Sequence, residues 1–498
     1  MSASTTLVWL RRDLRLADNP ALHAAIAGGG PVVPVFVWGD APGPWSTGAA
    51  ARWWLYHSLR ALDADLRGRG SRLVVMRGPA VAALAALARR CDAGHLHCSR
   101  TLDPDEPSAT RLRQALSKAG APIGVTVHDA GLLFGPPFPT TAEGRPYHVF
   151  TPFWRGCQAA GPPPRPQPAP SRLAPCPGQA GGMTPDEVRA EAVPPWSAGF
   201  ADSRPGEAGA HDRLGDFVAG ALARYAEDRD RPDLDGTSLL SPHLHFGEIS
   251  ARAVWHAIDD TLNGGGGSEA FLRQLVWREF AHHLLLEHPR TTSEPLRPAF
   301  ARFPWNDDPE ALAAWQQGRT GYPIVDAGMR QLWQTGWMHN RVRLVCASLL
   351  CKHLLIPWQH GARWFWETLL DADLADNTLG WQWVAGSGAD AAPYFRIFNP
   401  VSQGRRYDPA GAYVRRWVPE LAALPDAVIH APWEAPASVR RSAGVQLIEP
   451  GEAAALAAGR TGAQPLDDGC YPEPFIDHAL ARRRALDAFA TMKERAGA

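Results

Sequence analysis

Residues 337–341 read WMHNR, residues 371–377 read DADLADN and residues 381–383 read WQW. They form the centre of a stretch from Tyr322 to Pro400 that holds seven of the chain's twenty tryptophans, at 333, 337, 358, 364, 366, 381 and 383. This mixture is too polar for an ordinary core and too aromatic for an ordinary surface. It indicates a site that stacks flat rings and holds charge. The alternative at this point is a large helical domain that packs with tryptophan.

The composition around this stretch is that of a globular protein, with 45% hydrophobic and 20% charged residues. A chain of 498 residues has the length of roughly two to three domains. No run of about 18 apolar residues occurs, so we expect no membrane span. The first residues, MSASTT, lack the basic start of a secretory signal, and we expect none.

Cysteines and charge exclude several kinds of site. The seven cysteines are scattered without a Cys-x-x-Cys pair, which argues against a zinc ribbon, an iron–sulfur site and a disulfide framework. We therefore expect a cytoplasmic protein without a metal, and a monomer. The formal net charge is -1, so any binding of DNA must come from a local basic cluster.

The pattern along the chain predicts two domains. In residues 1–134, short apolar runs alternate with helical periodicity, which predicts a doubly wound, Rossmann-like α/β domain with a parallel sheet. It lacks the glycine fingerprint of dinucleotide binding, so this fold alone says little about function. Residues 135–210 are rich in Pro and Gly and predict an extended linker with little room for regular structure. Residues 211–490 predict an all-helical domain in which Ser268 caps a helix, and residues 491–498 a tail.

Several blocks in order carry a family resemblance. They read LVWLRRDLR at 7–15, DNPAL at 18–22, GTSLLSP at 236–242, HFGEIS at 245–250 and WREF at 277–280, followed by GYPIVD at 321–326 and the opening stretch. From end to end the chain resembles the photolyase/cryptochrome flavoproteins. It is most similar to the bacterial photolyases close to plant cryptochromes. The resemblance implies an N-terminal antenna domain, a linker and an all-helical domain that binds one FAD.

The resemblance also implies a set of FAD-binding residues. The GTSLLS segment offers hydroxyl and backbone N–H groups suited to a diphosphate without a metal, although a helix cap is an equal alternative. In the family, matching residues hold the FAD phosphates or surround them: Thr237, Ser238, Leu239, Leu240, Ser241, Tyr225, Phe271, Arg278, Trp337 and Asn340. Asp371 is expected to face the isoalloxazine edge and Arg343, and Asp373 to contact the ring or the ribityl region.

Asn377 resembles the family residue that faces flavin N5. Plant cryptochromes carry Asp there, so an uncharged amide favours repair over signalling. An ordinary Asn near the end of a helix is the alternative. Trp381, Trp358 and Trp305 resemble the family's electron-transfer chain from the flavin to the surface. Without the resemblance they would be interpreted as core packing.

On the substrate side, the family takes a flipped pyrimidine dimer into a pocket with aromatic walls. Trp277 and Trp383 match the walls, and Arg229, Arg341 and Arg396 match residues that contact flanking phosphates. Arg405 and Arg406 extend this patch or form a solvated face. Leu344 stands where many relatives have Met, and Gln274 where the common enzymes have Glu. Gln274 can donate a hydrogen bond to the dimer but cannot share a proton.

These matches predict light-driven splitting of cyclobutane pyrimidine dimers by electron transfer from excited, reduced FAD, with Gln274, Asn340 and Asn377 as catalytic residues. One alternative is a photolyase for 6-4 lesions, which would use Gln at 274 but needs His at 340 and 344. The other is a blue-light photoreceptor without repair activity, which we disfavour because of Asn377 and because we expect no long effector tail. An antenna of 5,10-methenyltetrahydrofolate is expected, with Glu106 as its contact. An acid at the start of a helix is the alternative for Glu106.

Overall fold

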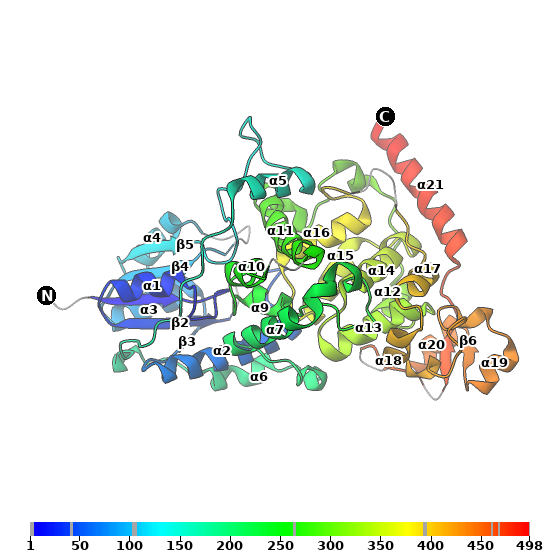
Figure 1. Cartoon of the computed structure of the whole chain (residues 1–498), viewed down its shortest axis with the longest axis horizontal. Coiled ribbons are helices and arrows are strands. Elements are labelled where there is room, and N and C mark those ends of the chain that lie inside the picture. Colours follow the sequence, from blue (N-terminus) through cyan, green and yellow to red (C-terminus); the bar gives the residue numbers. More distant parts are fainter. Residues whose placement is uncertain are drawn as a thin grey trace.

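The computed structural model describes residues 4–39, 43–101, 107–261, 265–391, 396–459, 462–466 and 469–497. Figure 1 shows the sheet domain at the N-terminal end, the large helical domain beside it, and the last helix running along the far side. The predicted fold class, an α/β domain followed by a helical domain, is confirmed. No helix in the described part of the chain is long and apolar enough to cross a bilayer.

A five-stranded parallel sheet organises the N-terminal domain, with strand order β3-β2-β1-β4-β5. The central strand β1 aligns Leu7 with Val33 of β2 and with Leu96 of β4. Because side chains alternate across a strand, Leu7 packs in the core on one face and Val8 in the core on the other. Both faces are therefore buried, as the continuous apolar runs predict. The strands are β1 (Thr5–Trp9), β2 (Val32–Trp38), β3 (Val74–Arg77), β4 (Ala93–Ser99) and β5 (Gly124–His128).

Helices cover the two faces of this sheet. The first begins at Pro20, and the Asn19 side chain caps it by accepting from the N–H of Leu22 at 3.0 Å. An Asn at the N-cap followed by Pro at the first helical position is a common helix start. The helices of the domain are α1 (Pro20–Ala27), α2 (Ala49–Gly68), α3 (Ala80–Arg90) and α4 (Ala109–Lys118).

The connection over residues 135–210 is more regular than its composition predicts. It contains α5 (Phe150–Ala160) and the short α6 (Arg189–Ala192), which corrects the expectation of little regular structure. Phe150, Phe153 and Cys157 of α5 are buried against the helical domain. Their spacing of three and four residues is an amphipathic helix signal that the surrounding prolines obscured.

The helical domain is built around α11 (Gly265–Glu287) and the segment from α13 to α16. A stripe of apolar side chains along and beside α14 is buried: Met338, Val342, Val345 and Leu349. The expectation that Ser268 caps a helix is wrong, because α11 already includes Gly265 and Ser268 lies buried inside it. The other elements are α7 (Glu207–Ala219), α8 (Tyr225–Asp228), α9 (Ser241–Phe246), α10 (Ala251–Asp259), α12 (Pro309–Gln316), α13 (Pro323–Thr335), α14 (Asn340–Ser348), α15 (Trp358–Thr368), α16 (Leu374–Ala385), α17 (Pro400–Tyr407) and α18 (Ala412–Trp417).

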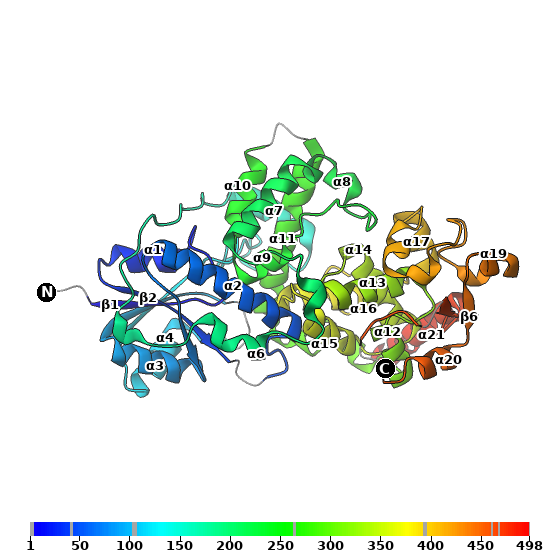
Figure 2. The ribbon, with the colours of Figure 1, turned by 90° about the horizontal axis from the view of Figure 1, so that it is seen from below.

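The C-terminal region packs beside this domain. Figure 2 shows it at the end of the molecule away from the sheet. The last helix, α21, spans His478–Gly497 and includes most of residues 491–498, which the sequence predicted to be a tail. The elements of the C-terminal region are α19 (Ala437–Ser442), β6 (Gln446–Ile448), α20 (Pro450–Leu456), β7 (Cys470–Pro472) and α21.

Buried charged side chains join the two domains. Arg15 donates to the carbonyl oxygen of Gly247 at 2.8 Å, and Gly247 has φ 66. A Cβ on Gly247 would lie 2.0 Å from the carbonyl oxygen of Arg12, so this close approach requires glycine. Glu279 accepts from the backbone N–H groups of residues 133–135, each at 3.0 Å. Parts of the LRRDLR, HFGEIS and WREF blocks therefore serve domain docking.

Candidate cofactor and DNA site

An acidic cradle lies where α9, α11, α14 and α16 converge, and we define it as Asp371, Asp373, Asp376, Arg278 and Arg343. Asp371 Oδ2 accepts from Arg343 Nη2 at 2.8 Å and from Ser241 Oγ at 2.6 Å. Arg343 also donates through Nε to the Met338 carbonyl oxygen at 2.7 Å, which fixes the direction of its guanidinium. The structure thus joins three residues that the sequence placed around a flavin.

Asp373 caps α16. Its Oδ1 accepts from the N–H groups of Ala375 and Asp376 at 3.0 and 3.2 Å, and its Oδ2 lies 3.3 Å from His245 Nδ1. Burial acts to raise the pKa of Asp373, but His282, the bond from His245, and Arg278 outweigh it and hold that pKa well below its usual range. Asp373 is therefore a fixed negative charge, and it bends the chain between Asp371 and the helix.

Asp376 is a cradle residue that sequence reasoning missed. Its side chain keeps an exposed part, although neighbouring protein atoms displace much of the water around its carboxylate. Burial, followed by the negative charges of Asp373 and Asp371, raises the pKa of Asp376 to about 7. A signal was present in the sequence, because Asp373 and Asp376 have the spacing of an N-cap and the third helical residue, which lie at the same helix end.

Two further groups lie next to cradle residues in the sequence or to their partners, Asn377 after Asp376 and Leu239 two residues before Ser241. Asn377 donates from Nδ2 to the Ala362 carbonyl oxygen at 3.1 Å, which leaves its Oδ1 as an acceptor on the other side of the amide. Leu239 in the GTSLLS segment has φ 52, an uncommon value for a residue other than glycine, while the next residue, Leu240, is right-handed at φ -82. Successive residues of opposite hand turn their N–H groups to one side and form a concavity suited to an anion.

These observations test whether the residues fit FAD. Asp371 Oδ1 is buried and accepts no hydrogen bond from the described residues. Asp371 Oδ1 and Asn377 Oδ1 are acceptors suited to N–H donors of a ligand, and the concavity at Leu239 is suited to an anionic group. A flavin with its diphosphate supplies both, so the residues fit the cofactor.

Next to the cradle we define an aromatic and basic rim. It consists of Gln274, Trp277, Trp383, Arg229, Arg341 and Asp230. The ring of Trp277 stacks on the buried ring of Phe150, with centroids 3.7 Å apart and planes 5° apart. Phe150 thereby covers one face of the Trp277 ring and holds the ring in place. Trp383 on α16 is also half-buried. Sequence reasoning missed Phe150, because it lies in the region interpreted as a linker.

Arginines at this rim are held by polar partners. Arg341 Nη2 lies 2.6 Å from Asp230 Oδ2, and its guanidinium carbon lies 4.6 Å from the centre of the Tyr407 ring. Arg406 approaches the same ring at 5.1 Å. The rim therefore presents guanidinium groups in fixed positions, as phosphate contacts require.

The comparisons with known proteins agree with this geometry. Residues 271–491 match the family described as the FAD binding domain of DNA photolyase, and residues 6–171 match DNA photolyase. A deoxyribodipyrimidine photo-lyase from Agrobacterium fabrum is 44% identical over 99% of this chain and 99% of its own length. The chain belongs to the photolyase/cryptochrome family.

Other members of the photolyase/cryptochrome family are similar over most of the chain. Cryptochrome-1 of Arabidopsis thaliana is 39% identical over 90% of this chain and 67% of its own length. The crystal structure of a bacterial class III photolyase from Agrobacterium tumefaciens has a TM-score of 0.90 and 44% identity, covering 99% of this chain and 98% of its own. The cryptochrome structure from Synechocystis has a TM-score of 0.84 at 28% identity, covering 98% and 99%.

The tryptophans that match the family's electron-transfer chain occupy connected cores. Trp381 and Trp358 are buried in one cluster, and the half-buried Trp305 packs against that cluster and a second one under α21. A Cβ on Gly361 would lie 2.0 Å from the Trp381 ring, so glycine permits this packing. Electron transfer along these rings stays a prediction.

The other predicted site residues differ in their burial. Tyr225 and Phe271 are buried in edge-to-face contact at 5.2 Å, and Trp337 and Leu344 are half-buried. Asn340 is exposed at the first residue of α14. The exposed Arg396 has its carbonyl oxygen bonded by the buried Lys352. Glu106 lies outside the described residues.

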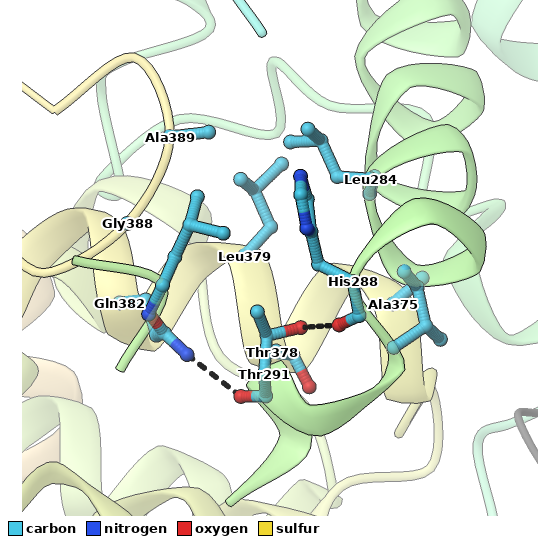
Figure 3. Close-up of a pocket in the computed structure, with 12 residues that line it drawn as sticks. Leu284, His288, Thr291, Ala375, Thr378, Leu379, Gln382, Gly388 and Ala389 are labelled. Carbon is cyan, nitrogen blue, oxygen red and sulfur yellow. Dashed lines mark hydrogen bonds between the residues drawn. The ribbon is translucent and has the colours of Figure 1, made fainter. Parts of the chain in front are cut away.

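A pocket between α11 and α16 differs from the cradle in its chemistry. Figure 3 shows Leu284, Leu379 and Ala389 around it, with Gln382 donating to the Thr291 carbonyl oxygen at 2.7 Å. Its described lining includes no carboxylate and no guanidinium group. It therefore lacks the charges that the cradle offers to a flavin. No group of three or more His, Cys, Asp or Glu placed to hold a metal ion occurs in the described part of the chain.

Proposed function

We propose that this protein is a light-driven DNA lyase, a deoxyribodipyrimidine photo-lyase that splits cyclobutane pyrimidine dimers with FAD. The observation that carries the proposal is the position of α11 between the cradle and the rim. Its Gln274 and Trp277 belong to the rim, while its Arg278 is close enough to act on the charges of Asp373 and Asp376. One helix thus places Gln274 and Trp277, which would contact the lesion, next to the residues that would bind FAD.

FAD would be held by the cradle and by the GTSLLS turn. Asp371, Arg343 and Asn377 would bind the isoalloxazine ring, and the hydroxyl and N–H groups of residues 237–241 the diphosphate, with Tyr225, Phe271, Arg278, Trp337 and Asn340 around them. Bound in its reduced form and excited by light, FAD would supply the electron needed to split the two carbon–carbon bonds of the dimer, and the electron would return to it.

The chain's own residues bind and orient the dimer. Trp277, fixed by Phe150, and Trp383 form the walls that hold two flipped bases away from water. Gln274 donates a hydrogen bond to a pyrimidine carbonyl, where negative charge develops. Arg229, Arg341 and Arg396 would bind the phosphates on either side, and the held positions of Arg229 and Arg341 would set the register of the strand.

The test is repair of UV-irradiated oligothymidine by the purified, photoreduced protein under blue light, with a dark control. Thymine absorbance returns as dimers split. Recovery in light alone is the expected result. No recovery with FAD bound and fully reduced would contradict the proposal and favour the photoreceptor alternative. The similarity to Arabidopsis cryptochrome-1 supports that alternative.

We further propose that a second chromophore, 5,10-methenyltetrahydrofolate, serves as antenna and that Glu106 contacts it. The protein would act as a cytoplasmic monomer. Purification with added folate, followed by absorption spectra of the wild type and of Glu106→Gln, tests the antenna. Equal folate content in both proteins would contradict the role of Glu106. Size-exclusion chromatography with light scattering tests the monomer.

A further inference from the structure

Gln274 and Arg229 contact each other at the rim. Arg229 follows α8, and its Nη2 donates to Gln274 Oε1 on α11 at 2.9 Å. The Nε2 of the same amide donates to the Ala270 carbonyl oxygen at 3.2 Å. Both ends of the Gln274 amide therefore have a defined partner.

The chemistry of the two groups decides how the amide is oriented. A guanidinium group has only donors, so it accepts only the oxygen of an amide as a partner. The NH2 group must then lie on the far side from Arg229. It has two hydrogens, and the bond to Ala270 uses one of them. The second hydrogen remains to donate to a ligand.

Arg229 itself is well fixed for a half-buried side chain. Its guanidinium carbon lies 5.5 Å from the centre of the Tyr225 ring, and Tyr225 is buried against Phe271 at 5.2 Å. Its backbone N–H donates to the Tyr225 carbonyl oxygen at 3.0 Å. Because the anchor is rigid, the orientation of Gln274 is set before any DNA binds.

We propose that Arg229 is a positioning residue that orients the Gln274 amide, so that its NH2 group reads a carbonyl oxygen of the damaged pyrimidines. This inference rests on the proposed function and assigns Arg229 a role in lesion preference in addition to phosphate contact. A glutamate at 274 would neutralise Arg229 in an ion pair. The neutral Gln274 leaves the charge of Arg229 available to a phosphate.

The experiment measures dark binding of the FAD-loaded protein to one oligonucleotide with and without a single cyclobutane thymine dimer. The readout is the ratio of the Kd for undamaged DNA to the Kd for damaged DNA. Arg229→Ala and Gln274→Ala should each lower this ratio about tenfold, the effect of one lost base-reading bond. The double variant should lose about tenfold as well, because both changes remove the same contact. Arg229→Lys, which keeps a donor, should restore most of the ratio.

Arg341→Ala is the matched control, since Arg341 pairs with Asp230 rather than with Gln274. It should weaken binding of both DNAs by one factor and leave the ratio unchanged. The inference is overturned if Arg229→Ala behaves in the same way, or if the double variant loses the product of the two single effects. A wild-type ratio near one would instead overturn the proposed function. Flavin absorbance of each variant shows that the cofactor site is intact.

Discussion

The cradle and the rim are built from the same residue types but held together differently. In the cradle, Asp371 is buried and its bond to Arg343 is one of several that fix both groups. Arg343 in the cradle and Arg341 at the rim are similarly exposed, at 23% and 21%, but the rim carboxylate Asp230 is 33% exposed whereas Asp371 is 2% exposed. Removing the partner of a buried carboxylate is costly, whereas a partly exposed carboxylate can be replaced as a partner by water or by a phosphate at a lower cost. The cradle is therefore suited to a resident cofactor and the rim to a DNA strand that comes and goes.

Asp371→Ala tests the cradle side of this comparison with the largest expected effect. It leaves the guanidinium of Arg343 without its carboxylate, and we expect the free energy of unfolding to fall by about 3 kcal/mol. FAD should also be lost during purification. Urea denaturation and flavin absorbance measure both.

Glu434→Gln is the control for that variant. It breaks the pair of Arg405 with Glu434, which has a similar distance of 2.9 Å but is 50% and 53% exposed. The cost should stay below about 1 kcal/mol. Equal losses in the two variants would contradict the distinction between cradle and rim.

Gly361→Ala tests whether the packing behind the cradle is rigid. The added methyl group would lie 2.0 Å from the Trp381 ring, and overpacking of this kind costs about 2 kcal/mol. Photoreduction of the bound flavin should slow as Trp381 shifts. Gly215→Ala, on an exposed part of α7 with nothing within 4 Å, should instead be neutral or stabilising. Unchanged stability of the Gly361 variant would show that the ring adapts.

Asp376→Asn tests the cradle through the pH dependence of its stability. The folded protein holds this proton up to about pH 7, while an ordinary Asp releases it near 3.8. The folded state thus binds more protons over this window, and the wild type loses stability as the pH rises through it. Asparagine carries no charge, so the Tm of the variant should exceed that of the wild type at pH 8, and the gap should shrink toward pH 5. A gap that is the same at both pH values would contradict the raised pKa of Asp376, and Asp212→Asn on the exposed face of α7 is the control.

Asp230→Asn has the smallest expected effect and tests the rim. It frees Arg341 from its partner and removes a negative charge next to the expected phosphates. Affinity for damaged and undamaged DNA should rise by about threefold, the range of an exposed pair. Glu227→Gln changes the net charge equally but lies beside Arg224, and it should have a weaker effect. Fluorescence anisotropy measures both, and equal gains would show that only net charge matters.

Much of this account was predictable from the sequence. The alternation of apolar runs predicts the parallel sheet, and the blocks from LRRDLR to DADLADN place Asp371, Arg343 and Asn377 at one site. Asp376 was missed because the family blocks give it no role, although its spacing from the N-cap Asp373 puts both at the same helix end. Phe150 was missed because prolines mask the periodicity of α5. The contact of Arg229 with Gln274 joins residues 45 apart, and such pairs are set by tertiary packing, which local patterns do not reveal.

The most direct test of the central claim uses two defined oligonucleotides, one with a single cyclobutane thymine dimer and one with a single 6-4 lesion. Each is mixed with the photoreduced protein, illuminated with blue light or kept dark, and analysed by chromatography. The account predicts that only the cyclobutane dimer is converted to intact thymines, and only in the light, because no histidine occupies positions 340 and 344. Persistence of the illuminated cyclobutane dimer, or conversion of the 6-4 lesion, would contradict it.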